Sequence, residues 1–587
     1  MMTSSENNLT KGPIPLMDNP ASSSHSPIEW GRTHVYAQNN LQLFSQLFQL
    51  GYSHPEITYI VEAYHLATQL FTCLYRPSYK CFVSHLVSTA SILSTLRAPV
   101  NLIAAGLLHA AYFRGGFGED HKGISESKRN QMRSVVGPET EAYIARYLTL
   151  PWTPSMISSL QRDTAQLSDI DRNVVILRLA NELEDHLDLA ILYGPSTEKR
   201  IERINRIGHL LIDLAEKLGA PVLGKELERV FNESLAREIP SELRRKSFSH
   251  NSFSTIPFSY RRPRRRWFPN LIAQGKQQQN GEPPEVKTCN FPAWIPSDSL
   301  ESLPSGAFHD IGSDSKPSYA QTNIQLYNQL RVMGYSKGAH MCVRNAYETA
   351  AQLFAGRYLL HGKMHIVHVV RTASILTSLL APVEVVAAGL IHNAYQNGDF
   401  GTGERGFTST KRRYLLQAVG PEVEQYVTGF TFLKWNPKTF LSILQELTAH
   451  QSINNHVVLL RLADLLEHNL DYGVLYFERT QQERYFSPSL NPLMIKMAEQ
   501  LGYPLLVRKL QRVYEQNSTG ILSPTKILKE MPTKSSVCYP KSCQKRLLIR
   551  LIQKLKPSFP RLAQILGSLI LRIKTGTGQS AYSREVL

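Results

Sequence analysis

The sequence predicts an all-α protein that contains two tandem copies of one helical domain, and three observations support this. Apolar residues recur at helical spacing through most of the chain from about residue 41. Alternating β-branched runs bounded by turns, which would indicate strands, are missing. His85 and His109 return as His368 and His392 at one constant offset (368 − 85 = 392 − 109 = 283). A period this long indicates domain duplication, because solenoid repeats recur roughly every 20–50 residues.

Length and composition are consistent with this organisation. The chain has 587 residues, which suits roughly two to four domains, and its hydrophobic fraction of 42% is enough for packed cores. Six scattered cysteines without a CxxC pair indicate reduced thiols. The N-terminus has no basic segment followed by an apolar run, and no window of about 18 apolar residues occurs. We therefore expect a cytoplasmic protein, with peripheral membrane attachment as the alternative.

The elements of the first repeat follow from its apolar pattern and its breaks. A first helix begins at Leu41 and is broken at Gly51. Further helices are expected over about 55–74, 85–96, 100–111, 127–136, 139–148, 172–190, 198–218 and 225–238. Pro99 can open the helix over 100–111, which is apolar on nearly every side and should lie centrally. The run Gly137-Pro138-Glu139 should end one helix and begin the next, because Pro and Glu suit a first turn.

The same signals recur in the second half without a change of register. The matching runs are Gly51-Tyr52-Ser53 with Gly334-Tyr335-Ser336, Gly137-Pro138-Glu139 with Gly420-Pro421-Glu422, Trp152 with Trp435, Leu177-Arg178-Leu179-Ala180 with Leu460-Arg461-Leu462-Ala463, and Leu218-Gly219 with Leu501-Gly502. The constant offset predicts the same helix order in both copies.

This pattern divides the chain into five parts. They are a disordered leader (1–36), repeat one (37–239), a disordered basic linker (240–318), repeat two (319–518) and a basic amphipathic tail (519–587).

Much of the net charge of +17 lies in the linker and the tail. The linker contains the basic run 261–267, and residues 541–574 of the tail alternate basic and apolar side chains without one acid between Lys541 and Lys574. Such segments suit an anionic membrane surface or an acidic partner, through electrostatics that read no nucleic-acid sequence. The alternative for the tail is a helix that docks onto the folded repeats.

The paired histidines are the candidate site. Two imidazoles on neighbouring helices can converge on one metal ion, because neutral imidazole binds first-row divalent cations well. A hydrolytic site normally adds carboxylates, and the metal then lowers the pKa of a bound water. Ordinary core histidines with hydrogen-bond partners are the other interpretation, and the sequence leaves both open.

Several motifs together resemble the HD superfamily of phosphohydrolases. They are a histidine on one helix, Ala-Ala-Gly-Leu-(Leu/Ile)-His at the end of a buried helix, Val-Gly-Pro-Glu, and Leu-Arg-Leu-Ala-(Asn/Asp). The resemblance covers both repeats and is nearest to guanosine tetraphosphate hydrolase-like members and smaller uncharacterised HD-like domains. It implies an all-α domain that binds a divalent metal through a His, a His-Asp pair and a distant Asp.

Transferred residue by residue, the resemblance places His368, His392 and Asp464 at metal positions of repeat two. In repeat one it offers His85 and His109. It implies Mn, Fe or Mg as the metal of repeat two.

Both repeats depart from the family pattern. Ala110 and Asn393 stand where the family has the aspartate of its His-Asp pair, and Asn181 replaces the distant aspartate of repeat one. Losing anionic oxygen weakens the binding of hard cations. Repeat one is therefore not expected to hold a metal, and repeat two keeps one family carboxylate.

Nearby acids recur in both copies: Glu184 and Asp188, then Glu467 and Asp471. They could replace the missing ligands, but we expect them to pair with Arg178 and Arg461 or to face solvent.

Five residues of repeat two are candidate ligand-binding groups. They are Asn393, Tyr395, Lys411, Arg412 and Arg461. The basic ones suit an anionic nucleotide and the tyrosine could stack on a base, whereas packing and solvent exposure are the alternatives.

These observations predict a catalytically impaired tandem HD-like protein that binds an anionic small molecule, a nucleotide or a partner and acts in regulation. One alternative is a metal-dependent phosphohydrolase, or a related metal oxygenase, working from repeat two. The other is a peripheral membrane or scaffold protein that uses its basic tail.

Overall fold

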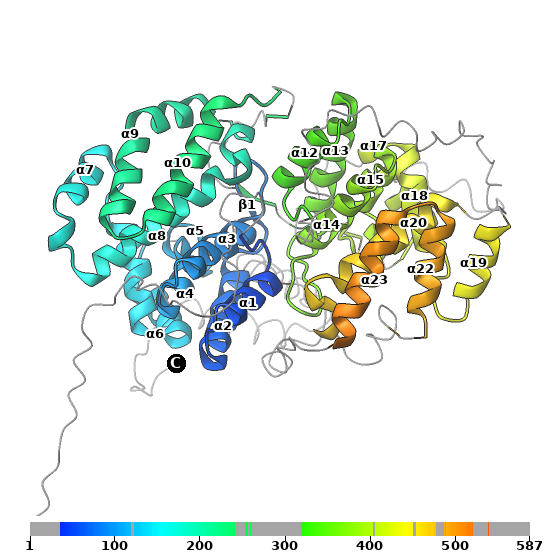
Figure 1. The fold of residues 1–587 in the computed structure, drawn as a ribbon, viewed down its shortest axis with the longest axis horizontal. Helices are drawn as coiled ribbons and strands as arrows, with labels where there is room; N and C mark the ends of the chain where they lie inside the picture. The colour runs from blue at the N-terminus through cyan, green and yellow to red at the C-terminus, as the bar shows by residue number, and fades with distance from the viewer. Residues whose placement is uncertain are drawn as a thin grey trace, which may run out of the picture.

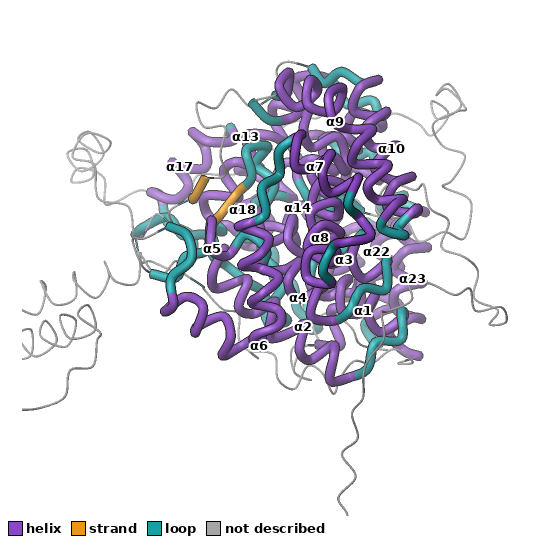
Figure 2. Tube along the Cα trace, turned by 90° about the vertical axis from the view of Figure 1, so that its left-hand side faces the viewer, coloured by secondary structure: helices purple, strands orange, loops and turns teal. Residues whose placement is uncertain are grey.

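The computed structural model gives the architecture of both repeats. The described residues are 36–118, 122–195, 197–240, 243–244, 253–255, 257, 259, 319–402, 406–449, 454–476, 487, 489–519 and 538. Within them the protein is all-α, as predicted, and strands are limited to β1 (Leu74–Tyr75) and β2 (Phe253–Ser254), which pair (Figures 1 and 2). The basic segments 261–267 and 541–574, and the leader before residue 36, lie outside the described residues.

Repeat one is a cluster of helices that lies beside repeat two (Figure 1). Its elements are α1 (Asn40–Gln49), α2 (His54–Phe71), α3 (Phe82–Thr95), α4 (Val100–Leu108), α5 (Ala111–Arg114), α6 (Glu126–Thr149), α7 (Pro154–Arg162), η1 (Thr164–Gln166), α8 (Asp169–His186), η2 (Leu187–Tyr193), α9 (Thr197–Lys217) and α10 (Pro221–Ala236).

Repeat two has the same order of elements. They are α12 (Asn323–Val332), α13 (Lys337–Leu353), α14 (His365–Ser378), α15 (Val383–Gly389), α16 (Ala394–Asn397), α17 (Ser409–Val419), α18 (Pro421–Phe432), α19 (Phe440–Thr448), α20 (Asn455–Asn469), η5 (Leu470–Tyr476), α22 (Asn491–Gln500) and α23 (Pro504–Thr519). The first residues of α12 and α1, and those of α14 and α3, differ by the offset of the histidine pairs (323 − 40 = 365 − 82 = 283). The predicted duplication therefore holds at the level of individual elements.

The helices α3 and α14 lie at the centre of their repeats. Every residue of α3 is buried, because the helix packs against α4 on one side and α8 on another. Helix α14 packs in the same way against α15 and α20. Helix α3 also carries polar side chains such as Ser84, Ser88 and Ser91, and these are buried with the apolar ones. These two helices carry the first histidine of each predicted pair.

The predicted break after residue 136 is confirmed. Gly137 has φ of 70° and Gly420 has φ of 86°, a backbone conformation that glycine adopts without strain. In repeat one the break is a kink within α6, and in repeat two it separates α17 from α18.

Other predicted boundaries were wrong. The helix expected over 172–190 ends at His186, because Asp188 and Leu189 have positive φ and start the irregular segment η2. Helix α7 was not predicted, although Thr153 caps it and Pro154 suits its first turn.

Part of the predicted linker is ordered onto repeat one. The strand β2 pairs with β1, and the ring of Phe253 packs against Tyr75 and Tyr79 at centroid distances of 5.9 and 4.9 Å. The expectation of a linker without structure therefore does not hold for this short segment.

The two repeats contact each other around an approximate two-fold axis. Asn40 Nδ2 donates to the carbonyl of His361 (2.8 Å), and its equivalent Asn323 donates to the carbonyl of Ser78 (3.0 Å). Cys81 lies against its own equivalent, Met364, with 3.3 Å between the sulfur atoms. Contacts exchanged in this way define an isologous interface, the type found in symmetric dimers.

Buried tyrosines extend the same symmetry. Tyr64 Oη donates to the carbonyl of Gly362 and Tyr347 Oη to that of Tyr79, each at 2.8 Å. The buried apolar residues of both repeats form one continuous core. The duplicated chain is therefore an internal pseudo-dimer.

Hydropathy adds one finding about the described helices: none combines the length and apolar character that a bilayer crossing requires.

Candidate functional site

Three elements of repeat two bring the candidate site together. His368 lies on the central helix α14, His392 follows the end of α15, and Asp464 lies on α20. Gly389 allows the close approach, because a Cβ at this position would lie 2.8 Å from Leu376 Cδ1 and 3.2 Å from the Cα of Ala373. The three predicted metal positions of repeat two therefore meet.

The carboxylate of Asp464 lies between imidazole nitrogens. Its Oδ1 is 3.3 Å from Nε2 of His368, 3.3 Å from Nε2 of His392 and 3.5 Å from Nε2 of His468. Nevertheless, Oδ1 makes no hydrogen bond of ordinary geometry with the described residues. Oδ1 is buried, and His368 and His392 are each 1% exposed, so this carboxylate oxygen faces imidazole nitrogens without a hydrogen bond to them.

Contacts at the Nδ1 atoms fix the orientation of the two imidazole rings. His392 Nδ1 donates to the carbonyl of Gly389 (2.8 Å), and His368 Nδ1 contacts the carboxylate of Glu467. A carbonyl oxygen can only accept, so Nδ1 of His392 carries a proton, and Nε2 is the nitrogen that faces Asp464. Metal-binding histidines are usually held in this way by a second layer of acceptors.

A buried lysine completes the second layer. Lys363 Nζ forms an ion pair with Glu467, and the side chains are 2% and 1% exposed. Burial alone would raise the pKa of Glu467, but Lys363 and His368 hold it well below its usual range. Glu467 is therefore an ionised carboxylate that can only accept hydrogen bonds.

The electrostatics of the cluster favour positive charge at its centre. Burial alone would raise the pKa of Asp464, but His392 and His368 hold it well below its usual value. Burial alone would lower the pKa of His368, whereas Glu467 and Asp464 raise it to about 9. The carboxylates therefore attract either a proton on His368 or a cation bound at the same place.

The residues of repeat two fit a divalent metal ion. In a tetrahedral site with bonds of about 2.1 Å, neighbouring donor atoms lie roughly 3.4 Å apart, close to the distances around Asp464 Oδ1. His368, His392 and Asp464 supply two nitrogens and one oxygen. Imidazole-rich donor sets suit Fe²⁺, Mn²⁺ or Zn²⁺ better than Mg²⁺, which prefers oxygen.

The equivalent place in repeat one does not fit a metal. His85 and His109 do meet, with ring centroids 5.3 Å apart, and His109 Nδ1 donates to the carbonyl of Gly106. However, Arg76 Nη1 lies 3.4 Å from His85 Nε2, and the same guanidinium pairs with Asp185. Repeat one therefore supplies its own cation where repeat two has the apolar Leu359.

The acids near the histidines have other partners than predicted. Glu184 pairs with Lys80 and contacts His85, and Glu467 does the same with Lys363 and His368. The expectation that they pair with arginines of their own helix or face solvent was wrong, because each carboxylate points into the core toward the helix that carries the first histidine.

The other two acids, Asp188 and Asp471, do not pair with Arg178 and Arg461 either. Asp471 pairs with Arg371, and Asp188 accepts from Gln325 Nε2 (2.9 Å).

The predicted ligand-binding residues of repeat two have hydrogen-bond partners within the fold. Asn393 Oδ1 lies 3.0 Å from His365 Nε2, and Tyr395 Oη donates to Glu424 (2.6 Å). Lys411 Nζ donates to the carbonyl of Gly406 (2.7 Å). These contacts occupy polar atoms of all three side chains, and their role in ligand binding stays a prediction.

The remaining two predicted ligand groups, Arg412 and Arg461, also have partners within the fold. Arg412 Nε pairs with Glu424 (3.2 Å). The guanidinium of Arg461 stacks 3.5 Å from the ring centroid of Phe430, whose ring in turn packs on His392. Arg461 therefore supports the site from outside.

Sequence reasoning missed His468, Lys363 and Arg76. The signal for His468 was present, because it lies four residues after Asp464 and thus on the same helix face. Lys363 and Arg76 lie far from their acidic partners in sequence, so no local pattern could have revealed them.

Comparison with known proteins finds one family match in each repeat, and that match carries no activity. Residues 76–151 and 352–434 both match the family described as a domain of unknown function (DUF6817). Both segments include a histidine pair, and their last residues differ by the offset of the duplication (434 − 151 = 283). No curated protein matches the chain.

Proposed function

We propose that this tandem DUF6817 protein is a metal-containing binding or regulatory protein, with an HD-like metal site in repeat two alone. The observation that carries the proposal is Asp464 Oδ1, a buried oxygen that faces the Nε2 atoms of His368 and His392 without a hydrogen bond. A bound ion would satisfy all three atoms. Repeat one keeps the helical framework, but Arg76 takes the place of the ion.

Binding is favoured over efficient catalysis for two reasons. Asn393 replaces a family carboxylate, and its amide oxygen already contacts His365. The imidazoles of the site are almost fully buried, and the side chain of Asp464 is only 12% exposed. A metal held there would act as a Lewis acid and could lower the pKa of a bound water, but few of its positions would be open to a substrate.

Elemental analysis of the full-length protein tests the metal site. After purification and reconstitution with Fe²⁺, Mn²⁺ or Zn²⁺, we expect close to one equivalent of one metal per chain. Asp464→Ala and His392→Ala should lose it, because each removes a donor atom. Asn181→Ala and His109→Ala, at the equivalent positions of repeat one, are the matched controls and should keep it.

Two results would overturn this proposal. One is the absence of stoichiometric metal under all three reconstitution conditions. The other is equal loss of metal in the repeat-one controls, which would place the ion elsewhere.

The metal-dependent phosphohydrolase is the second candidate. It needs the same site, so metal-dependent release of phosphate from nucleotides that His392→Ala abolishes would favour it over pure binding. The peripheral membrane hypothesis depends on residues 541–574, which lie outside the described residues, and it stays a prediction.

A further inference from the structure

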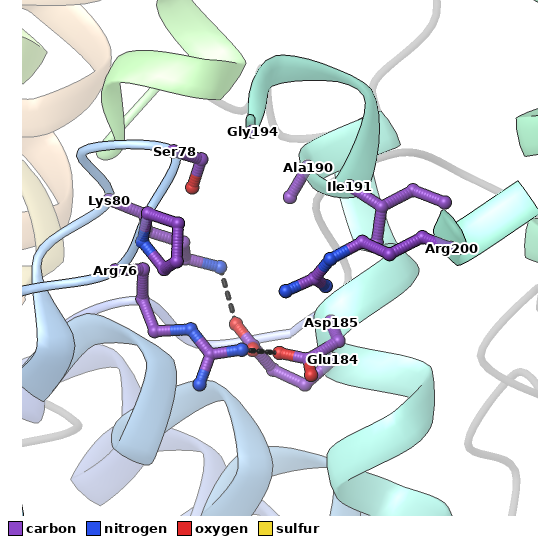
Figure 3. Close-up of a pocket in the computed structure, with 10 residues that line it drawn as sticks. Arg76, Ser78, Lys80, Glu184, Asp185, Ala190, Ile191, Gly194 and Arg200 are labelled. Atoms are coloured by element: carbon purple, nitrogen blue, oxygen red, sulfur yellow. Dashed lines mark hydrogen bonds and ion pairs between the residues drawn. The ribbon is translucent and has the colours of Figure 1, made fainter. Parts of the chain in front are cut away.

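A second candidate site lies in repeat one and is independent of the metal proposal. It is a pocket between the segment before α3 and the segment η2, with about 330 Å³ of empty space that includes its opening to solvent (Figure 3). Both walls contact repeat two, because the carbonyl of Ser78 accepts from Asn323 and the carbonyl of Asp188 accepts from Asn328 (2.6 Å). Both walls of the pocket are therefore held in place by repeat two.

Charged side chains line this pocket and leave it with excess positive charge. Three are basic (Arg76, Lys80 and Arg200) and two are acidic (Glu184 and Asp185). Arg76 pairs with Asp185 and Lys80 pairs with Glu184, as the dashed lines in Figure 3 mark. These two pairs are each neutral and leave the charge of Arg200.

Arg200 is the group without a contacting partner. It makes no hydrogen bond or ion pair with the described residues, and its guanidinium points into the pocket toward Lys80 and Asp185 (Figure 3). Burial lowers the pKa of Arg200, but an arginine stays charged in proteins. A partly buried guanidinium without a counter-ion in contact is costly, and a bound anion would relieve that cost.

We infer that this pocket binds the phosphate group of a small phosphorylated molecule. Arg200 would contact the phosphate oxygens through two parallel N–H groups, the geometry in which a guanidinium matches phosphate. The hydroxyl of Ser78, which has no hydrogen-bond partner among the described residues, adds a donor from the opposite wall.

The corresponding residues of repeat two lack this character. At the offset of 283, Arg76 corresponds to Leu359 and Arg200 corresponds to Glu483. Two positive charges are thus replaced by one apolar and one acidic side chain. The anion pocket is therefore specific to repeat one, as the metal site is to repeat two.

Isothermal titration of the full-length protein tests the inference. Pyrophosphate and inorganic phosphate serve as probes, with acetate as a carboxylate probe, in a buffer that contains a chelator. We expect saturable binding of pyrophosphate to one site per chain and at least tenfold weaker binding by Arg200→Gln, because a charge-assisted pair is lost. Arg206→Gln, an exposed arginine on the same helix, is the matched control and should bind like the wild type.

Further variants separate this site from the metal site. The Asp464→Ala variant should bind pyrophosphate with unchanged affinity, because Asp464 lies in repeat two and not in this pocket. Ser78→Ala should bind a few-fold more weakly. Arg200→Lys should bind better than Arg200→Gln, which keeps the test informative if the glutamine variant unfolds.

Three results would overturn the inference. They are no saturable binding of either phosphate probe, equal weakening by Arg206→Gln, and acetate binding as tight as that of pyrophosphate. Absence of metal from the reconstituted wild-type protein, together with intact pyrophosphate binding, would instead contradict only the proposed function.

Discussion

At the scale of single residues, the two repeats differ in how the charge of their buried carboxylates is compensated. Each buries a glutamate beside its first histidine, Glu184 in repeat one and Glu467 in repeat two. Repeat one adds the guanidinium of Arg76, which contacts both His85 and Asp185. Buried carboxylates need compensating positive charge, and a guanidinium or a metal ion can each supply it. Where the chain supplies the charge itself, an ion has no role.

This reasoning predicts that three substitutions will create a metal site in repeat one. Arg76→Leu removes the internal cation, while Asn181→Asp and Asp185→His introduce the donors found in repeat two. The triple variant should bind about two metal equivalents per chain in place of about one, because His85 and His109 are already oriented by Glu184 and Gly106. Elemental analysis measures the change.

The single substitution Arg76→Leu is the control for this variant. It should add no metal, since Asn181 still lacks a carboxylate. If the triple variant also stays at one equivalent while it remains folded by circular dichroism, the charge argument for repeat one is wrong.

The sequence allowed part of the site to be predicted. The spacing of His368, His392 and Asp464 within a recognisable pattern was enough to bring them together. The sequence could not reveal that Asn393 contacts His365 and that Tyr395 donates to Glu424, because side-chain direction depends on neighbours from other helices. Ion pairs such as Lys363 with Glu467 join residues 104 positions apart and leave no local signal.

At the scale of elements, close helix contacts set the distance between the paired histidines. Gly389 lies against Ala373 and Leu376 of α14, and Gly106 has the same contacts with Ala90 and Leu93 of α3. A side chain at either glycine would separate the two helices. The second histidine of each pair, three residues later, would then move away from the first.

We therefore expect Gly389→Ala to weaken both folding and metal binding. The added Cβ would overlap Leu376 Cδ1 at 2.8 Å, and overpacking of this kind costs about 1–3 kcal/mol. Urea unfolding measures the loss of stability, and the metal dissociation constant should rise in the same variant. Gly338→Ala is the control, because that exposed helical glycine has only Ser336 Oγ near, at 3.9 Å. It should raise stability by roughly 0.5–1 kcal/mol.

The kinked helix α6 is held together by one buried acid. Glu141, after the kink, accepts hydrogen bonds from Arg129 and Arg133 before the kink and from Tyr112 on α5. Burial alone would raise the pKa of Glu141, but the bonds from Arg129 and Tyr112 lower it below its usual value. Glu141 thus joins the two halves of α6.

Glu141→Gln should therefore destabilise the protein in a pH-dependent way. A carboxyl whose pKa is lowered on folding stabilises the fold above its unfolded pKa of about 4.3, and this contribution is lost as the pH falls through the folded pKa. We expect a loss of about 1.5–3 kcal/mol at pH 7 that shrinks below about pH 4. Urea unfolding at several pH values measures it.

The control for this prediction is Glu126→Gln. Glu126 is 67% exposed and pairs with the same Arg133 at 3.3 Å, so its loss should cost less than about 1 kcal/mol. A cost for Glu141→Gln that does not depend on pH would contradict the assigned role.

Element prediction succeeded where one local signal dominated. Gly137 and Gly420 marked their breaks because glycine adopts positive φ without strain. The end of α8 was missed because Asp188 and Leu189 adopt positive φ without being glycine. The equivalent residues Asp471 and Tyr472 have the same conformation, so the irregular turn belongs to the repeated fold and not to one local sequence signal.

At the scale of the whole molecule, the duplication produced an interface as well as a second domain. The sequence predicted two copies joined by a linker, and it held no information on how they meet. In the structure Tyr64 of repeat one and Tyr347 of repeat two each bond to a carbonyl of the other repeat. A continuous core across both repeats implies that they unfold together.

The approximate symmetry makes a quantitative prediction for this pair of tyrosines. Tyr64→Phe leaves the carbonyl of Gly362 without its donor, and Tyr347→Phe does the same to the carbonyl of Tyr79. An unsatisfied buried carbonyl costs about 1–3 kcal/mol, so both variants should lose similar stability in that range. Urea unfolding should show one transition for the wild type and for both variants, since both repeats share one continuous core.

A tyrosine away from the interface provides the control. Tyr335→Phe loses a bond to the carbonyl of Ala381 within repeat two and leaves the contact between the repeats intact. Hydrogen exchange of the most protected amides should therefore rise in both repeats for Tyr64→Phe, because this substitution weakens a bond that both copies share. For Tyr335→Phe, we expect the additional local exchange to centre on the segment around Ala381 in repeat two. Exchange confined to repeat one in Tyr64→Phe would mean that the two copies are stabilised separately.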